Sequence, residues 1–240
     1  MKSLNRSLIG SAVFALAAVV GAPAHAAFFA TVCNDLACTG GDDITIQDNG
    51  AGDNIAALGG ISFSTSAFGY SLLVNTSQSK PMIGSAAAPQ LDLTFTATSS
   101  AAGGGNVFLY TSDTDFVSSG SFLLALGGTN SGGSGTVTGR AWGGSSNTAL
   151  QFSGANLIGT SGAQSGSSYS NSVSGSFSSA VNPYSLTIGA AITRTTAGTS
   201  TGDLNLQVSA IPEPETYALM LAGLALLGGV AKRRKLATAA

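Results

Sequence analysis

The carboxylates that could do chemistry between residues 27 and 210 are all aspartates, because this range holds no glutamate and no histidine. Asp113 and Asp115 are the strongest catalytic candidates, since residues two apart on a strand share a face. A glycosidase needs two carboxyls about 5 to 9.5 Å apart, whereas a Ser-His-Asp triad is excluded without histidine. Because Ser-Asp-Thr-Asp (residues 112–115) also reads as a solvated turn, we predict no enzymatic activity and keep an aspartate-dependent secreted hydrolase as an alternative.

A second group of aspartates could hold a metal ion. Asp42, Asp43, Asp48 and Asp53 lie near one another among glycines, with Asn54 beside them. Hard oxygen ligands in a pliable loop suit calcium, although the spacing is not that of an EF-hand. Asx turns, in which a side chain accepts backbone amides, explain the same pattern. The sequence therefore predicts no cofactor except a structural calcium ion as one possibility.

The two cysteines and the single tryptophan invite two further interpretations. Cys33 and Cys38 are separated by four residues, and in an oxidising compartment they should form one disulfide. Trp142 would stack on sugar rings if exposed, which makes a carbohydrate-binding β-sandwich a second alternative. A buried tryptophan is an equally open interpretation.

These residues must be positioned by strands, because the dominant period between residues 27 and 210 is two. Alternating apolar and polar residues predict strands at 91–98, 184–193 and 204–209. Further strands are predicted over Phe28–Val32, Ile44–Gln47, Ile61–Ser64, Tyr70–Asn75, Val107–Thr111, Ser121–Leu126, Gly135–Trp142, Ala149–Ser153 and Tyr169–Phe177. Turns are predicted between them at glycine pairs, including Gly127-Gly128. The body, residues 27–210, is thus predicted to be an all-β, antiparallel, jelly-roll-like β-sandwich.

Charge excludes one class of partner. Residues 27–210 contain nine aspartates and only three scattered bases, Lys80, Arg140 and Arg194. Such a surface cannot neutralise a row of phosphates, so nucleic acid is not a predicted partner.

The first 26 residues have the pattern of a secretory signal peptide. Two bases precede an apolar run, and small residues follow it. Ala24, Ala26 and Ala27 define the predicted cleavage site, with the cut after Ala26. The secretion translocon and signal peptidase are therefore predicted partners, and residues 1–26 a signal helix.

Residues 211–235 have a different character. A proline-broken peptide, Pro212-Glu213-Pro214, precedes an apolar run over residues 217–231 that predicts a hydrophobic sorting helix. The helix ends at a basic cluster, Lys232, Arg233, Arg234 and Lys235, which should stay in the cytoplasm. We expect a transient transmembrane helix in the inner membrane, with the body on the far side.

These three features, in this order, resemble the tripartite tail of PEP-CTERM proteins. The resemblance implies that an exosortase, a membrane cysteine peptidase or transpeptidase, recognises the tail and cuts near Pro212-Glu213-Pro214. It also implies a Gram-negative bacterium that makes exopolysaccharide. We therefore predict an exported protein of the cell surface or extracellular matrix. Its role would be structural or adhesive in the biofilm, with exopolysaccharide as a candidate partner.

Overall fold

Strand formation follows the alternation of side chains along the chain. The computed structural model of the chain describes residues 27–100, 105–144, 146–152, 154–210 and 219–227. In β5 (Gln90–Ser99) the apolar positions are buried, and the polar positions between them are partly exposed. The same pattern governs β12 (Gly198–Ala210), where Leu204 and Leu206 point inward and Asn205 points outward.

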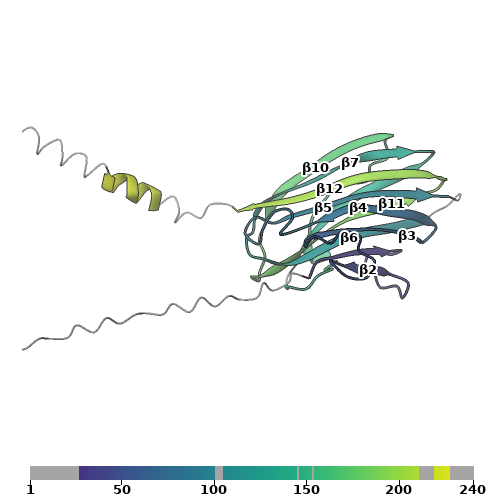
Figure 1. The fold of residues 1–240 in the computed structure, drawn as a ribbon. Coiled ribbons are helices and arrows are strands. Elements are labelled where there is room, and N and C mark those ends of the chain that lie inside the picture. Colours follow the sequence, from purple (N-terminus) through teal and green to yellow (C-terminus); the bar gives the residue numbers. More distant parts are fainter. Residues whose placement is uncertain (1–26, 101–104, 145, 153, 211–218, 228–240) are drawn as a thin grey trace, which may run out of the picture.

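The strands form two six-stranded antiparallel sheets that pack face to face (Figure 1). Sheet A has the order β2 (Ile44–Gln47), β1 (Phe29–Cys33), β6 (Gly105–Phe116), β11 (Tyr184–Arg194), β8 (Gly135–Gly143) and β9 (Leu157–Thr160). Sheet B has the order β10 (Ser168–Phe177), β7 (Gly120–Ser131), β12, β5, β4 (Tyr70–Gln78) and β3 (Gly60–Ala67). A short 3-10 helix, η1 (Gly154–Asn156), precedes β9. The predicted antiparallel β-sandwich is confirmed, whereas the strand order does not confirm a jelly roll.

The core lies between the two sheets and is built from aliphatic and aromatic side chains of both. Each fully buried leucine or phenylalanine contributes about 2 kcal/mol through removal of apolar surface from water. Sheet A provides, among others, Val32, Leu109, Phe116, Leu186 and Ile188. Sheet B provides, among others, Phe63, Leu72, Leu93, Phe95, Leu124 and Leu206.

The predicted turn at Gly127-Gly128 is wrong, because β7 runs through both residues. A Cβ atom on Gly128 would come within 2.1 Å of the Thr201 carbonyl oxygen and 2.5 Å of the Tyr169 hydroxyl. Glycine is therefore required here for close approach of β12 and of the Tyr169 ring from β10. The glycines permit tight strand packing and do not end the strand.

Part of the outer face of sheet A is buried under a loop, although the alternation in the sequence predicted that this face is exposed to solvent. Thr187, a polar position of β11, is fully buried together with its neighbour Ser185. The covering segment is 146–152: the Ser185 hydroxyl donates to the Ser146 carbonyl, and the Leu150 amide donates to the Ser112 hydroxyl. The predicted strand over Ala149–Ser153 is accordingly wrong, because its described residues, 149–152, form no strand.

Arg194 fastens one end of the sandwich from the inside. Its side chain is 1 % exposed, and its Nη2 donates to the carbonyls of Ser131 (2.9 Å) and Gly132 (3.0 Å). Its Nη1 donates to the Ser200 hydroxyl at 3.0 Å, and its Nε donates to the Thr196 carbonyl. The guanidinium thus ties the β7–β8 turn to the β11–β12 turn.

Near the other end of the sequence, residues 219–227 form a helix. Among the residues the structure describes, no helix is long and apolar enough to cross a membrane, so the transmembrane helix predicted over residues 217–231 is not confirmed. The predicted signal helix, residues 1–26, lies outside the described residues.

Candidate functional site

Trp142, the predicted sugar-stacking residue, lies in a buried aromatic cluster on the outer face of sheet A. Its side chain is only 3 % exposed. Its ring meets the rings of Tyr110 and Phe152 edge-on, with centroids 5.7 and 5.8 Å apart. The described tyrosines are buried as well: Tyr70, Tyr110, Tyr169 and Tyr184. Stacking on a sugar requires a solvent-exposed ring face. Trp142, on which the carbohydrate-binding alternative was based, does not have one.

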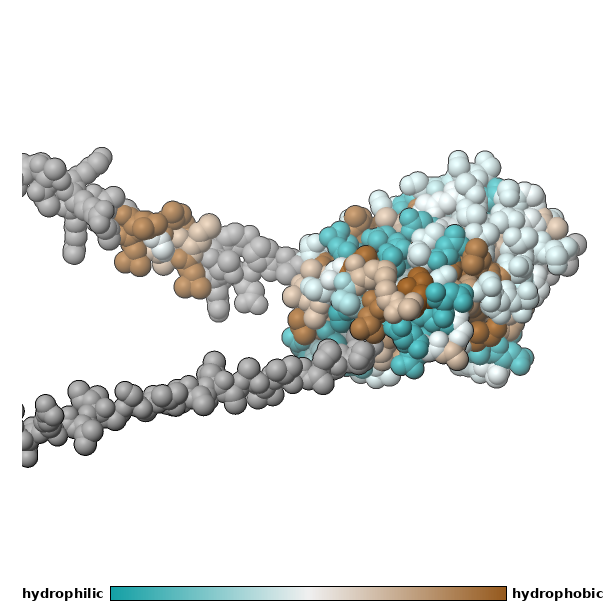
Figure 2. Space-filling model, in the orientation of Figure 1, coloured by the Kyte–Doolittle hydropathy of each residue, from teal (hydrophilic) through white to brown (hydrophobic). Residues whose placement is uncertain are grey.

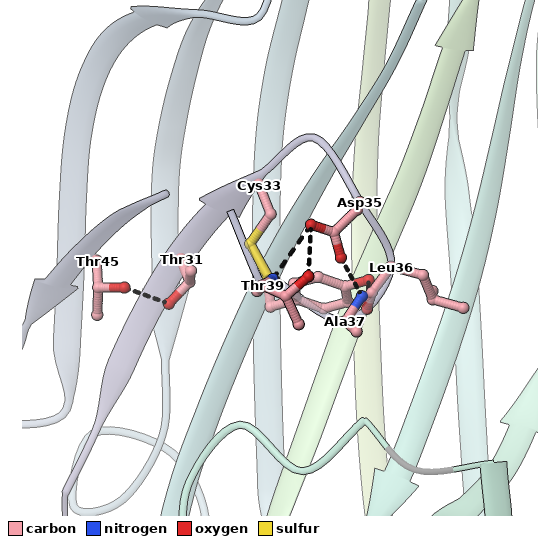
Figure 3. The surroundings of a disulfide bond; sticks show 9 residues. Thr31, Cys33, Asp35, Leu36, Ala37, Thr39 and Thr45 are labelled. Carbon is pink, nitrogen blue, oxygen red and sulfur yellow. Dashed lines mark hydrogen bonds between the residues drawn. A yellow bond between two sulfur atoms is a disulfide. The ribbon is translucent and has the colours of Figure 1, made fainter. Parts of the chain in front are cut away.

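The disulfide loop closes over this cluster. Cys33 and Cys38 form the predicted disulfide, with Cα atoms 5.3 Å apart. Asp35 organises the loop, because its carboxylate accepts the amides of Ala37 (2.8 Å) and Thr39 (3.1 Å) (Figure 3). The Leu36 carbonyl in turn accepts the Tyr110 hydroxyl at 2.9 Å. This arrangement is a structural cover for the aromatic side chains.

Asp113, the first catalytic candidate, is completely buried between the sheets. Its Oδ2 accepts the Lys80 ammonium at 2.8 Å and the Ser79 hydroxyl, and its Oδ1 accepts the Thr114 amide at 2.7 Å. Burial raises the pKa of Asp113, and the neighbouring Lys80 charge opposes that rise. All of these donors come from the protein, so the carboxylate is held as an internal ion pair.

Asp115 does not share a face with Asp113, so that prediction is wrong. The register of β6 against β11 shifts here, and Phe116 occupies the next core position after Asp113. Asp115 has a positive φ of 63°, typical of a bulge. Its amide donates to Asn147 Oδ1 at 2.8 Å, and its carboxylate accepts Asn147 Nδ2. The two aspartates therefore lie on different faces of β6 and have separate hydrogen-bond partners.

The start of the described chain meets the same end of β6. The Ala27 amide donates to the Thr114 hydroxyl at 3.0 Å, and that hydroxyl donates to the Asp115 carboxylate at 3.2 Å. An open hollow beside this chain of hydrogen bonds is lined by Ala27, Thr45, Asp115 and Asn147, among others. Ala27, one of the predicted cleavage residues, is thus fixed to the body; Ala24 and Ala26 lie outside the described residues.

The aspartates of the predicted calcium loop mostly accept backbone amides. Asp53 accepts the amides of Asn49 (3.0 Å), Ile55 (2.9 Å) and Ser62 (3.1 Å). Asp48 accepts the Gly59 amide at 2.8 Å.

The other two aspartates of this group lie apart from Asp48 and Asp53. Asp42 is exposed, while Asp43 lies near Cys33 and Cys38, whose sulfurs form the disulfide. The four carboxylates do not converge on one point among the described residues. Only the contact of Asp53 with the Ile55 amide, two residues on, is that of an Asx turn, and the other contacts join more distant parts of the loop. Calcium binding stays a prediction.

Hydroxyl and amide side chains line much of the outer side of sheet B, in a surface that we call the polar face and that the exposed side chains of Leu73 and Leu123 interrupt. Thr98 and Thr199 hydroxyls meet at 3.0 Å, and Thr129 and Thr201 hydroxyls meet at 2.8 Å across neighbouring strands. The polar face comprises the outward side chains Thr94, Thr96, Thr98, Thr129, Ser131, Thr199, Thr201, Asn205 and Gln207, with Asp92 and Asp203. No strand of sheet B contains a lysine or arginine.

Asp92 and Asp203 form a carboxyl pair in the middle of this face. The Thr94 hydroxyl lies 3.5 Å from Asp92 Oδ2 and 3.4 Å from Asp203 Oδ1. Partial burial and the adjacent Asp203 charge raise the pKa of Asp92 to about 6. Asp92 can therefore hold a proton in mildly acidic surroundings and accept hydrogen bonds when that proton is lost.

Sequence reasoning did not find this pair, nor the Lys80–Asp113 ion pair or the buried Arg194. Asp92 stood out only as a polar residue between leucines. Its partner is 111 positions further along the chain and is brought alongside by the pairing of β5 with β12. The sequence nevertheless contained one signal. Charged residues are rare in the strands of sheet B, so an aspartate within such a strand indicates a specific role.

The sorting residues themselves, Pro212, Glu213, Pro214, Lys232, Arg233, Arg234 and Lys235, lie outside the described residues. No curated protein sequence matches the chain. Among solved structures, the crystal structure of the infectious bursal disease virus VP2 subviral particle is 11 % identical, with a TM-score of 0.14. The alignment covers 82 % of this chain and 63 % of that chain, and at this TM-score it carries no argument. Residues 210–235 match the family model of the PEP-CTERM protein-sorting motif, which implies export and sorting by an exosortase, and the chain is therefore a PEP-CTERM protein.

Proposed function

We propose that this protein is a non-enzymatic structural or adhesive component of the cell surface or the exopolysaccharide matrix. The sorting motif at residues 210–235 is the observation that carries the proposal. The motif addresses the chain to an exosortase, and the β-sandwich is the cargo that is delivered. Cutting near Pro212-Glu213-Pro214 would separate the sandwich from the sorting helix and the basic cluster.

The polar face supports contact with polysaccharide by hydrogen bonds. Its threonine hydroxyls, amides and two carboxylates offer donors and acceptors in rows set by the strand spacing of about 4.8 Å. Sugar hydroxyls complement such rows, and many weak contacts along a polymer add through multivalency. The absence of lysine and arginine from sheet B disfavours selection of anionic groups and favours neutral stretches of polymer.

The buried state of Asp113 and Trp142 supports this proposal over the two alternatives. Asp113 is paired with Lys80 inside the sandwich, and Trp142 is packed under the disulfide loop. A hydrolase or a sugar-stacking domain built on either residue would first require the fold to open.

Mass spectrometry of the protein from cells and from medium tests the sorting step. We expect a product that begins at Ala27, keeps the Cys33–Cys38 disulfide and ends before Leu219. A variant with Pro212→Ala and Pro214→Ala should keep the tail and stay with the membrane fraction. A secreted wild-type product that still contains Leu219 would refute the processing step.

A deletion strain tests the matrix role. We expect altered biofilm architecture, restored by the wild-type gene but not by the variant with both prolines replaced. The purified body should not hydrolyse the matrix polysaccharide. Unchanged biofilm, together with free diffusion of the mature protein away from the matrix, would contradict the proposal.

A further inference from the structure

The four edge strands of the sandwich differ in how well they are protected against pairing with another strand. β2 and β9, the edges of sheet A, are four residues long. β3, one edge of sheet B, has a register shift between Ile61 and Phe63. β10, the opposite edge, pairs with β7 over ten consecutive residues without a shift. Short length and bulges are devices that block edge pairing, and β10 has neither.

β10 also lacks the chemical devices that protect an edge. Its sequence, Ser-Tyr-Ser-Asn-Ser-Val-Ser-Gly-Ser-Phe, contains no charge and no proline, and its neighbour β7 is likewise uncharged. Small, exposed serines alternate along its outer side, at positions 168, 170, 172, 174 and 176. Pale, near-neutral residues gather over one end of β7 and β10 in Figure 2, seen in the orientation of Figure 1.

The free side of β10 presents backbone groups that a strand would satisfy. In an antiparallel pair, alternate residues direct their N–H and C=O groups away from the partner strand. About half of the backbone groups of β10 therefore point away from β7, and none of the described residues forms a further strand on that side. The complement to such a row is the edge of another extended strand.

We propose that β10 pairs antiparallel with β10 of a second copy of this chain, which joins two B sheets into one continuous sheet. This inference rests on the proposed structural role, and it identifies a second copy of the chain as the binding partner. A two-fold axis perpendicular to the sheet keeps the serine side of both copies on the same face. The pairing is longest when the axis passes between the two copies of Ser172 or of Val173, and either register pairs nine residues.

A second copy suits this edge because identical uncharged strands do not repel each other. β10 and β7 contain no acidic or basic residue, and burial raises the pKa of the Tyr169 hydroxyl, so pairing carries no electrostatic penalty near neutral pH. In the register centred on Val173, the inner side of the new seam would place Val173 opposite Val173 and Tyr169 opposite Phe177, which are the apolar residues of β10. Closure by a two-fold axis also limits the assembly at this edge to two copies.

Sedimentation equilibrium of the protein purified from producing cells tests the pairing. Ser172→Lys with Ser174→Lys places lysine opposite lysine in either register, because Ser172 faces itself or Ser174. The matched control, Asn205→Lys with Gln207→Lys, adds the same charge in the same rows of the sheet, on central strand β12. We expect wild type and control to dimerise alike, and the edge variant to dimerise at least about tenfold more weakly.

Hydrogen exchange gives a readout that does not depend on the variant's folding. Amides of β10 in the wild type should gain protection as protein concentration rises, while amides of edge strand β3 should not. A wild-type monomer at all concentrations, or equal dimerisation of the edge variant, would overturn the inference. Retention in the matrix distinguishes the two proposals. If the strand pairing is refuted but the edge variant is still retained in the matrix, the proposed function is unaffected. If the wild-type protein is not retained in the matrix, the proposed function fails as well.

Discussion

Replacing Lys80 with methionine should destabilise the protein by about 3 to 5 kcal/mol at pH 7.5. Methionine keeps much of the aliphatic stem but leaves Asp113, which is completely buried, without its cation. The remaining donors are the Ser79 hydroxyl and the Thr114 amide. The contact of the Lys80 ammonium with the Phe116 ring, at 4.1 Å, would be lost as well and contributes about 1 kcal/mol.

The loss should depend on pH in a defined direction. Burial already raises the folded-state pKa of Asp113 above its ordinary value of 3.8, and removing Lys80 raises it further. A carboxyl with a raised folded-state pKa takes up protons on folding, so the free energy of unfolding falls as pH rises through that range. The deficit of the variant should therefore be largest near pH 7.5 and shrink towards pH 4.

Denaturant unfolding at pH 4.5 and 7.5, with the disulfide intact, measures both effects. Arg140→Met is the control, because Arg140 is a partly buried base that forms no ion pair among the described residues. Adding Asp113→Asn to the Lys80 variant should recover more than half of the loss by removing the buried charge. A loss under about 1 kcal/mol at pH 7.5, or one independent of pH, would refute the reasoning.

The remaining predictions concern the polar face and the disulfide cover. Asp203→Asn should lower the pKa of Asp92 from about 6 towards 3.8 and flatten the fall in stability between pH 4 and 7; an NMR titration of the Asp92 carboxyl that shows no change would contradict this. Replacing Cys33 and Cys38 with serine should cost about 2 kcal/mol, measured by denaturant unfolding, because the bridge closes a short loop. Trp142→Ala should cost about 3 to 5 kcal/mol by the same assay and leave glycan-array binding unchanged; lost binding in a folded variant would restore the sugar-stacking interpretation.

Local pattern was sufficient to predict every strand except β9, although it also predicted a strand over Ala149–Ser153 that does not form. The alternation from Leu91 onward places β5 correctly, because one face of that strand is wet and the other lies on the core. The same rule failed for Thr187 in β11, since polar residues of a strand can be buried when a loop covers them. It also failed at Gly128, where glycine serves close packing and the strand continues.

The chemistry of the candidate sites depended on contacts that no local pattern contains. Lys80 and Asp113 are 33 residues apart, and Asp92 and Asp203 are brought together by sheet order. The bulge before Phe116 separates Asp113 from Asp115 by inserting one residue into a two-residue period. The sequence identified Asp113 and Asp115 as candidates. The strand order and the bulge residue determine which side chains are actually in contact.

The hydrogen bond from Ala27 to Thr114 has a consequence for maturation. If signal peptidase cuts after Ala26, the nitrogen that is an amide in the precursor becomes a charged amine with additional protons to donate. The Asp115 carboxylate already lies one hydroxyl away and would gain a counter-ion that the uncut chain lacks. Proteolysis would then complete an interaction between the new amino terminus and the folded body. A cut one residue earlier or later would place the amino-terminal charge away from the Asp115 carboxylate.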